Sequence, residues 1–317
     1  MVEFCLPFRN LSKKSVALAG GKGAQLGEMF NAGIPVPPGF VVITPSFDLF
    51  LGENKLSSKI AAILKKVDVK HTPTVDSASK EIRSLISKGK TPKIVENEIY
   101  AQFDSLGAGL VAVRSSATAE DGANASWAGE LESYMNIQKG NLLETVKKCW
   151  SSLFTPRAIF YRIERKLDSH PVSVAVVVQK MVQSEVAGVV FSIHPVTKDK
   201  NQMVIEAAYG LGESVVAGLV SPDNYIVDKR DYSLLEVAVN EQEKMIIKKI
   251  SGAKVQTITV PVPPSLKSKQ KMDGKSIVSL AKICGGIEKH YKFPQDMEFA
   301  MEKGKIYIVQ SRPITTL

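Results

Sequence analysis

Cysteine is scarce in this chain of 317 residues, which contains three, at Cys5, Cys149 and Cys284. The number is odd, the three lie far apart in the sequence, and no two have the short spacing of a metal-binding pair. The pattern argues against a disulfide framework and against a thiolate zinc site. It is typical of reduced thiols, so we expect a cytoplasmic protein.

Long hydrophobic runs are also missing. No apolar stretch approaches the roughly 20 residues that a membrane-spanning helix needs, so we expect no membrane partner. The first residues, from Met1 to Arg9, lack a basic region followed by an apolar core, and we expect no secretory signal. The composition, 44% hydrophobic and 23% charged, is that of a soluble globular protein.

Histidine is rare as well. Two of the four histidines stand beside lysines and two precede prolines, and none lies near a serine or cysteine in a pattern typical of a catalytic triad. No two have metal-binding spacing. The histidines are His71, His170, His194 and His290.

The formal net charge of +9 raises the question of a nucleic-acid partner. Much of the excess lies on amphipathic stretches, such as residues 57–66 and 79–88, whose lysines are typical of solvated helix faces. No basic run interleaved with aromatic residues is present. We therefore expect no nucleic-acid partner, and a basic excess also fits an anionic nucleotide ligand. Salt-sensitive binding that ATP does not displace would favour the nucleic-acid alternative.

The order of the patterns predicts an α+β protein with two lobes: an N-terminal α+β lobe over residues 1–187 and a strand-rich lobe over residues 188–317. Residues 52–105 predict two or three amphipathic helices, and the prolines of residues 33–39 require an extended segment. From about residue 172 the pattern changes to strands, beginning with a continuously apolar one. We expect a cleft between the lobes near residues 182–190.

The segment Asp296–Pro313 predicts a β-hairpin that turns at Gly304. We expect Glu302 to lie opposite Ile306, because a shift by one residue would break the apolar face. That register forms one face from Phe299, Met301, Tyr307 and Val309, and the other from Glu298, Ala300, Ile308, Gln310 and Arg312. An acid opposite an amide, with an arginine beside them, suits a hard cation that carries polyphosphate. An ordinary half-exposed hairpin with a charged outer face fits the segment equally well.

A glycine-rich stretch, Ala19–Glu28, precedes a short predicted helix. Glycines let the backbone approach an anion, the start of a helix favours negative charge, and Lys22 adds a mobile positive charge. The stretch is not a P-loop, because that motif has Ser or Thr after its lysine and Gly23 follows here. A plain turn is the alternative.

Arg114 follows a short apolar strand predicted over residues 110–113, and hydroxyl-bearing and small residues come after it. This order suits a phosphate clamp, with the small residues up to Gly129 forming a flap. A structural ion pair of Arg114 with Glu120 or Asp121 fits the residues equally well.

A buried strand ends near Gln179 and passes into a polar linker that extends to Glu185. Backbone N–H and C=O groups at such a point could hold an adenine ring edge-on between the lobes. A plain connection between strands is the alternative.

Taken together and in this order, these motifs resemble the nucleotide-binding domain of the phosphoenolpyruvate synthase and pyruvate, phosphate dikinase family. The resemblance covers about residues 10–317 and implies an ATP-grasp fold with a nucleotide cleft between its two lobes. The stretch Ile205–Asp223 is similar to phosphoenolpyruvate synthases and rifamycin phosphotransferases.

The resemblance implies ATP and magnesium as cofactors, and it assigns roles to eight residues. Lys22, Arg114 and Arg312 are expected to bind the phosphates and to act as catalytic cations. Gly129 and Ser133 are expected in the flap, and Gln179 at the adenine. The expected magnesium ligands are Glu298 and Gln310.

The resemblance further implies an ATP-dependent phosphotransferase of pyruvate metabolism that passes a phosphoryl group (in this family a pyrophosphoryl) from Mg-ATP to a histidine. In relatives that histidine belongs to a swivelling domain and has a Gly-Gly-x-Thr-x-His-like context, which none of the four histidines here has. We expect a phosphohistidine domain in cis in a longer protein, or in trans as a split subunit. The alternatives are the ATP-binding module of a rifamycin phosphotransferase and a stand-alone ATP sensor without transfer.

Overall fold

The structure is a computed structural model that describes residues 3–118, 121–122, 125–126, 132–164 and 173–315. The chain divides into two compact units: the first comprises Met1–Glu28 and Pro38–Met181, and the second Met29–Pro37 and Val182–Leu317. The change of unit lies a few residues before the boundary of 187/188 expected from the sequence. Met29–Pro37 groups with the second unit, where the Ile308 amide donates to the Pro35 carbonyl at 2.9 Å.

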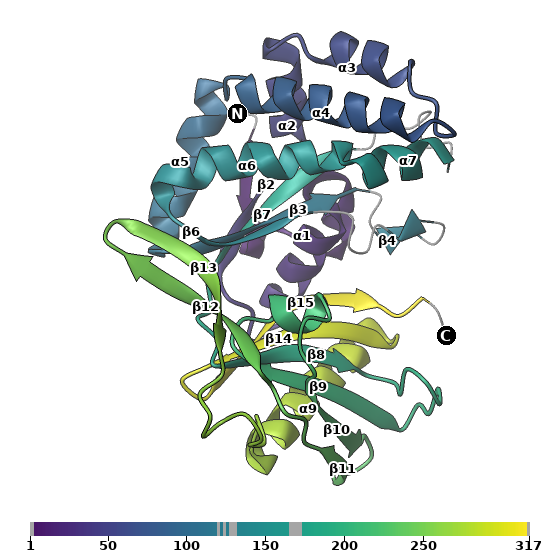
Figure 1. Ribbon diagram of the computed structural model, residues 1–317, viewed down its shortest axis with the longest axis vertical. Coiled ribbons are helices and arrows are strands. Elements are labelled where there is room, and N and C mark those ends of the chain that lie inside the picture. The colour runs from purple at the N-terminus through teal and green to yellow at the C-terminus, as the bar shows by residue number, and fades with distance from the viewer. Residues whose placement is uncertain (1–2, 119–120, 123–124, 127–131, 165–172, 316–317) are drawn as a thin grey trace. The chain divides into compact units, whose positions relative to one another are not determined.

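The first unit is built on a five-stranded sheet in which every described strand pair is antiparallel (Figure 1). The strands, in spatial order, are β1 (Cys5–Pro7), β2 (Gly39–Val42), β7 (Val174–Lys180), β3 (Val111–Ala117) and β6 (Ser133–Ile137). A separate short pair is formed by β4 (Asp121–Gly122) and β5 (Ala125–Ser126).

In the described part of the chain six helices lie on one side of this sheet, and α1 (Val16–Asn31) lies on the other (Figure 1). The six are α2 (Thr44–Glu53), α3 (Ser57–Leu64), α4 (Thr72–Lys88), α5 (Lys93–Leu106), α6 (Leu142–Ser151) and α7 (Pro156–Glu164). The 3₁₀ turns are η1 (Phe8–Asn10), η2 (Lys13–Ser15), η3 (Lys139–Asn141) and η4 (Ser152–Phe154). The helices predicted over residues 52–105 are thus confirmed.

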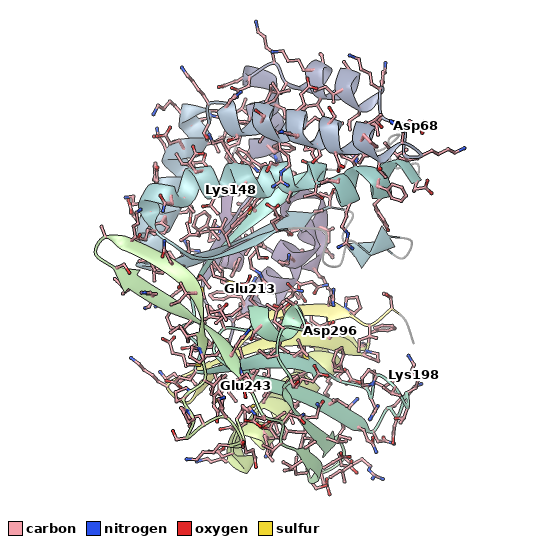
Figure 2. All side chains as sticks on the ribbon, in the orientation of Figure 1. Asp68, Lys148, Lys198, Glu213, Glu243 and Asp296 are labelled. Carbon is pink, nitrogen blue, oxygen red and sulfur yellow. The ribbon has the colours of Figure 1, made fainter. Side chains whose placement is uncertain are left out.

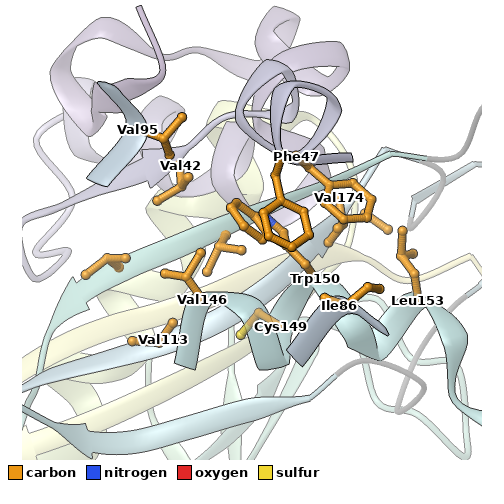
Figure 3. Packing of buried hydrophobic residues seen from close by; sticks show 14 of the residues in the cluster. Val42, Phe47, Ile86, Val95, Val113, Val146, Cys149, Trp150, Leu153 and Val174 are labelled. Atoms are coloured by element: carbon orange, nitrogen blue, oxygen red, sulfur yellow. The ribbon is translucent and has the colours of Figure 1, made fainter. Parts of the chain in front are cut away.

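The core of the first unit lies between the sheet and the six helices (Figure 3). Trp150 is fully buried there, with ring centroids 5.0 Å from Phe50 and 5.6 Å from Phe47. β7 is buried on both faces from Val174 to Gln179, which confirms the predicted continuously apolar strand. The three cysteines are free and buried, and burial raises the pKa of the Cys149 thiol to about 12.

The second unit is built on a six-stranded sheet whose described strand pairs are again antiparallel (Figure 1). In spatial order its strands are β11 (Leu234–Ala238), β10 (Asp223–Asp228), β9 (Gln202–Tyr209), β8 (Val186–Phe191), β14 (Gln295–Glu302) and β15 (Lys305–Pro313). A two-stranded sheet, β12 (Lys244–Ser251) and β13 (Lys254–Pro261), and the short helix α8 (Glu213–Val216) complete the strand-rich part.

One helix, α9 (Gly274–Tyr291), packs across the six-stranded sheet and contacts β10 and β14. The Asp273 side chain caps its start by accepting from the Ser276 amide at 2.7 Å. The covered face carries the fully buried Met297 and Phe299, so their strand neighbours Asp296 and Glu298 point to the opposite face. We call this opposite face the acidic face.

The antiparallel sheets and the helices outside them confirm the predicted α+β class. No helix in the described ranges is both long and apolar enough to cross a lipid bilayer.

Candidate functional site

Gly20 fixes the glycine-rich stretch against the first sheet. Its φ of +67° breaks α1 into two helical pieces, and a Cβ there would stand 2.3 Å from both the carbonyl oxygen and the Oγ of Ser116. The Ser116 hydroxyl donates to the Ala19 carbonyl at 2.8 Å and accepts from the Gly23 amide at 3.1 Å. The glycine-rich stretch is therefore held against β3 by close packing and by these two hydrogen bonds.

A Gly20→Ala substitution is expected to lower the free energy of unfolding of the first unit by about 1–3 kcal/mol, because the new methyl group overpacks a closed contact. Gly107→Ala is the matched control: its φ is also positive, +60°, but a Cβ there meets nothing within 4 Å. Urea unfolding followed by tryptophan fluorescence measures both. Equal losses in the two variants would contradict the role of the Ser116 contact.

Lys22 is 9% exposed, and its ammonium group donates to the Ser115 carbonyl at 2.7 Å. Ser115 turns its own hydroxyl to the other face of the sheet, where it lies 2.9 Å from the Ser152 hydroxyl. The lysine thus reaches the backbone of β3 directly beside Arg114. The glycine-rich stretch and the Arg114 motif, 92 positions apart in number, meet at this strand.

Arg114 lies within β3 and not at its end, because the strand continues to Ala117. The prediction of a strand that ends at Arg114 was wrong: Ser115, Ser116 and Ala117 are all buried and pair with β7. Small hydroxyl side chains fit a covered strand when the hydroxyls find backbone partners. The alternative ion pair with Glu120 or Asp121 lies outside the described side chains.

Two further predicted residues share the face of Arg114. Ser133 on β6 lies directly opposite Arg114 and is exposed. Gln179 on β7 lies opposite Ala112, two residues before Arg114, and is 2% exposed. Residues opposite each other in antiparallel strands point to the same face, so Arg114, Ser133 and Gln179 point to the α1 side. Gly129 lies outside the described residues.

In the second unit Glu298 lies directly opposite Gln310, which confirms the predicted pairing. The next pair along is Asp296 and Arg312, and the Arg312 guanidinium donates to the Asp296 carboxylate at 2.7 and 2.8 Å (Asp296 is labelled in Figure 2). This places an acid, an amide and an arginine next to one another on the acidic face.

The register near the turn differs from the prediction. Glu302 lies opposite Lys305 and not Ile306, because Lys303 and Gly304 form a two-residue turn with φ values of +50° and +72°. A bulge between Glu298 and Phe299 restores the predicted pairing farther along. As a result Ile308 joins Phe299 on the buried face, whereas Tyr307 and Val309 pack with Ala300 on the other.

Sequence reasoning missed two acids of this face. Asp296 stands two positions before Glu298 on the same strand. Because side chains two positions apart in a strand point to the same face, the sequence alone could have placed Asp296 beside Glu298. Glu206 on β9 lies opposite Val189, which lies opposite Glu298, and only the strand order brings it there. Burial raises the pKa of Asp296, against the lowering effect of Arg312, and burial together with Asp296 raises the pKa of Glu206.

The donor set of the acidic face fits magnesium. Glu298 and Gln310 offer hard oxygen ligands from directly opposed positions, whose Cβ atoms in such pairs lie about 4.5–5.5 Å apart. In the described part of the chain no group of three or more His, Cys, Asp or Glu side chains is arranged to hold a metal ion. Magnesium that carries a phosphate ligand is usually held by one or two protein carboxylates, with water and phosphate oxygens completing the shell.

Comparison with known proteins places the chain in a family of ATP-binding domains. The chain belongs to the family described as "Pyruvate phosphate dikinase, AMP/ATP-binding domain", which it matches over residues 16–317.

Several relatives carry names from this family. The chain is 48% identical to a probable phosphoenolpyruvate synthase of Methanocaldococcus jannaschii over 100% of its own length and 27% of the relative's. It is 45% identical to a probable phosphoenolpyruvate synthase of Archaeoglobus fulgidus over 97% of this chain and 41% of the relative. It is 39% identical to the rifampicin phosphotransferase of Bacillus cereus over 100% of this chain and 36% of the relative. The chain thus spans less than half the length of these three relatives.

Proposed function

We propose that this chain is the ATP-binding, phosphoryl-donor module of a phosphoenolpyruvate synthase-like enzyme. It binds Mg-ATP and passes a phosphoryl or pyrophosphoryl group to a histidine on another domain, in cis or in trans. The fold that goes with this proposal is the ATP-grasp fold. The family membership and the names of the longer relatives support this proposal.

The observation that carries the proposal is the arrangement on the acidic face. Glu298 and Gln310 stand as a directly opposed oxygen pair, and Arg312 stands one pair along with Asp296 beside it. The same face also carries a small apolar cluster nearer the turn of the hairpin, in which Tyr307 and Val309 pack with Ala300. A site for a metal-bound polyphosphate accounts for all three residue types.

Each residue has one task in this proposal. Glu298 and Gln310 hold the magnesium, which neutralises phosphate charge and polarises the transferred group when bound. Arg312, Lys22 and Arg114 stabilise the negative charge that develops on the phosphate oxygens. Ser133 and Gly129 belong to the flap over the phosphates, and Gln179 with the backbone after it meets the adenine. Asp296 orients the Arg312 guanidinium through its two hydrogen bonds.

The transfer step is a displacement at phosphorus. A ring nitrogen of the acceptor histidine forms an N–P bond as the P–O bond to the leaving nucleotide breaks, and the cations stabilise the oxygen that leaves. For a pyrophosphoryl transfer the attacked atom is the β-phosphorus and the leaving group is AMP. The chain's part is positioning and charge stabilisation, which is the main source of catalysis in phosphoryl transfer.

A second candidate shares this donor chemistry. The similarity to the rifampicin phosphotransferase of Bacillus cereus favours a module whose phosphoryl group ends on an antibiotic of the rifamycin class. The contacts that choose the final acceptor belong to the parts of the longer relatives that this chain does not span.

Lys22→Ala tests the donor role. We expect Mg-ATP affinity to fall roughly 10- to 100-fold, because one charge-assisted hydrogen bond to phosphate is lost. Lys14→Ala, at an exposed lysine of the same region, is the control and should leave the affinity unchanged. The affinity is measured by calorimetry. Transfer is measured by incubating the chain and labelled ATP with a separately made histidine domain of a relative.

The two measurements separate the alternatives. Label on the histidine that depends on Lys22 supports the donor module. Tight ATP binding without label in the wild-type chain would support a stand-alone sensor and contradict transfer. Unchanged ATP affinity in Lys22→Ala would remove this residue from the proposed site.

A further inference from the structure

A cavity of about 330 Å³ lies at the C-terminal end of α9, in the second unit. We call it the α9 pocket; its walls include Lys229, Tyr232, Glu288, Lys289, Lys292 and Phe293. It lies on the α9 side of the six-stranded sheet, whereas Glu298 and Gln310 point to the opposite face. Its size is that of a site for a small organic molecule, and it is not part of the proposed ATP site.

The charges of the pocket do not balance. The Lys229 ammonium group is paired with the Glu288 carboxylate at 2.6 Å and also donates to the Ser192 carbonyl at 2.7 Å. Within the described residues, neither Lys289 nor Lys292 makes an ion pair or a side-chain hydrogen bond. Two positive charges therefore remain at the pocket, which matches the charge of a phosphate monoester near neutral pH.

Aromatic rings form other parts of the wall. Phe293 lines the pocket with a ring that is 45% exposed. The Tyr232 hydroxyl lies so close to α9 that a Cβ at Gly285 would stand 2.6 Å from it. Two rings beside two ammonium groups favour an anion that also carries a planar group.

Two residues of the wall hold backbone conformations that side chains seldom adopt. Lys292, which directly follows the last residue of α9, has a φ of +59°, and Tyr232 has a φ of +62°. Glycine or asparagine is usual at such a helix end, because a Cβ is strained there. A lysine in this place keeps an ammonium group at the pocket at the expense of backbone strain.

We propose that the α9 pocket binds a small phosphate monoester with a planar ring, as a site separate from the one proposed for ATP. The phosphate is held by Lys289 and Lys292, and the ring lies against Tyr232 and Phe293. Lysines near a helix C-terminus also offset the negative end of the helix dipole. That role requires neither an aromatic wall nor a strained lysine, so variants separate the two explanations.

The test is calorimetric titration of the full chain with phenyl phosphate in the presence of saturating Mg-ATP, which occupies the other site. We expect saturable binding, and weaker binding of inorganic phosphate, which has no ring. Lys292→Gly should weaken binding of phenyl phosphate about tenfold or more, because a charge-assisted hydrogen bond is lost. The same substitution should not lower the melting temperature, because glycine relieves the strain.

The matched control is Lys55→Gly. Lys55 is an exposed lysine of the first unit with a φ of +53°, so the variant makes the same change of charge and of backbone strain away from the pocket. Its binding of phenyl phosphate should equal that of the wild-type chain.

Gly285→Ala keeps every charge but displaces Tyr232, and it should weaken the binding of phenyl phosphate more than the binding of inorganic phosphate. Absence of saturable binding, or equal binding by wild-type and Lys292→Gly chains, would overturn the proposal. Equal affinity for phenyl phosphate and inorganic phosphate would overturn the role of the rings.

Discussion

Replacing Glu298 by alanine is expected to slow transfer from Mg-ATP to the histidine domain about 10²- to 10³-fold. The variant removes the one carboxylate that directly opposes Gln310, and with it the charged ligand proposed for magnesium. Loss of a group that stabilises charge in the transition state typically has an effect of this size. The rate is measured as labelled phosphohistidine formed at saturating ATP, and manganese binding followed by electron paramagnetic resonance gives a readout independent of activity.

Two variants make this experiment specific. Glu302→Ala removes the same side chain from the same strand, but next to the turn opposite Lys305, and it should transfer at the wild-type rate. Glu298→Gln keeps the shape and loses the charge, so it should bind manganese weakly and transfer slowly. If Glu298→Ala and Glu302→Ala behaved alike, the acidic face would not be the metal site.

The sequence predicted this pairing correctly only because two shifts of register cancel. Glu298 and Gln310 were placed opposite each other correctly although the turn itself is one residue shorter than expected. The two-residue turn at Lys303 and Gly304 shifts the register, and the bulge shifts it back. A bulge leaves no signal in a period-2 pattern, so the side of Tyr307, Ile308 and Val309 was predicted wrongly.

Long elements with a regular period of buried residues were predictable from the sequence. α4, α5 and α9 show the 3.6-residue period of a helix with one buried face, and β7 is apolar throughout because both of its faces are covered. The edge strands β1 and β11 carry no such signal. β1 has three residues, and β11 is exposed along its length, so neither carries a pattern of burial.

Two contacts of the candidate site that the sequence did not predict depend on long-range pairing. Glu206 reaches the acidic face through β8, and Lys22 reaches the backbone of Ser115 through the kink at Gly20. Such contacts join segments far apart in the chain. They follow from strand order and packing, which no local pattern specifies.

A second large effect is expected from a fully buried ion pair of the second unit. Lys271 and Asp223 have side chains with no exposed surface, and their charged groups lie 2.8 Å apart. The Asp223 carboxylate also accepts from the Tyr225 hydroxyl and the Lys271 amide, both at 2.8 Å, and from the Asn240 amide at 3.0 Å. This network holds the loop before α9 and the loop after β11 to the start of β10.

Asp223→Ala is therefore expected to lower the free energy of unfolding by about 3–5 kcal/mol, because it leaves the Lys271 ammonium group buried without a counter-charge. Glu243→Ala is the control. It removes a carboxylate that pairs with Lys267, in the loop that also contains Lys271. This pair is solvent-exposed, so its loss should lower the free energy of unfolding by less than about 1 kcal/mol. Urea unfolding followed by far-ultraviolet circular dichroism measures both. Adding Lys271→Met to Asp223→Ala should restore part of the stability, since the buried charge is then removed. A loss in Asp223→Ala no greater than in Glu243→Ala would show that the network does not hold these loops.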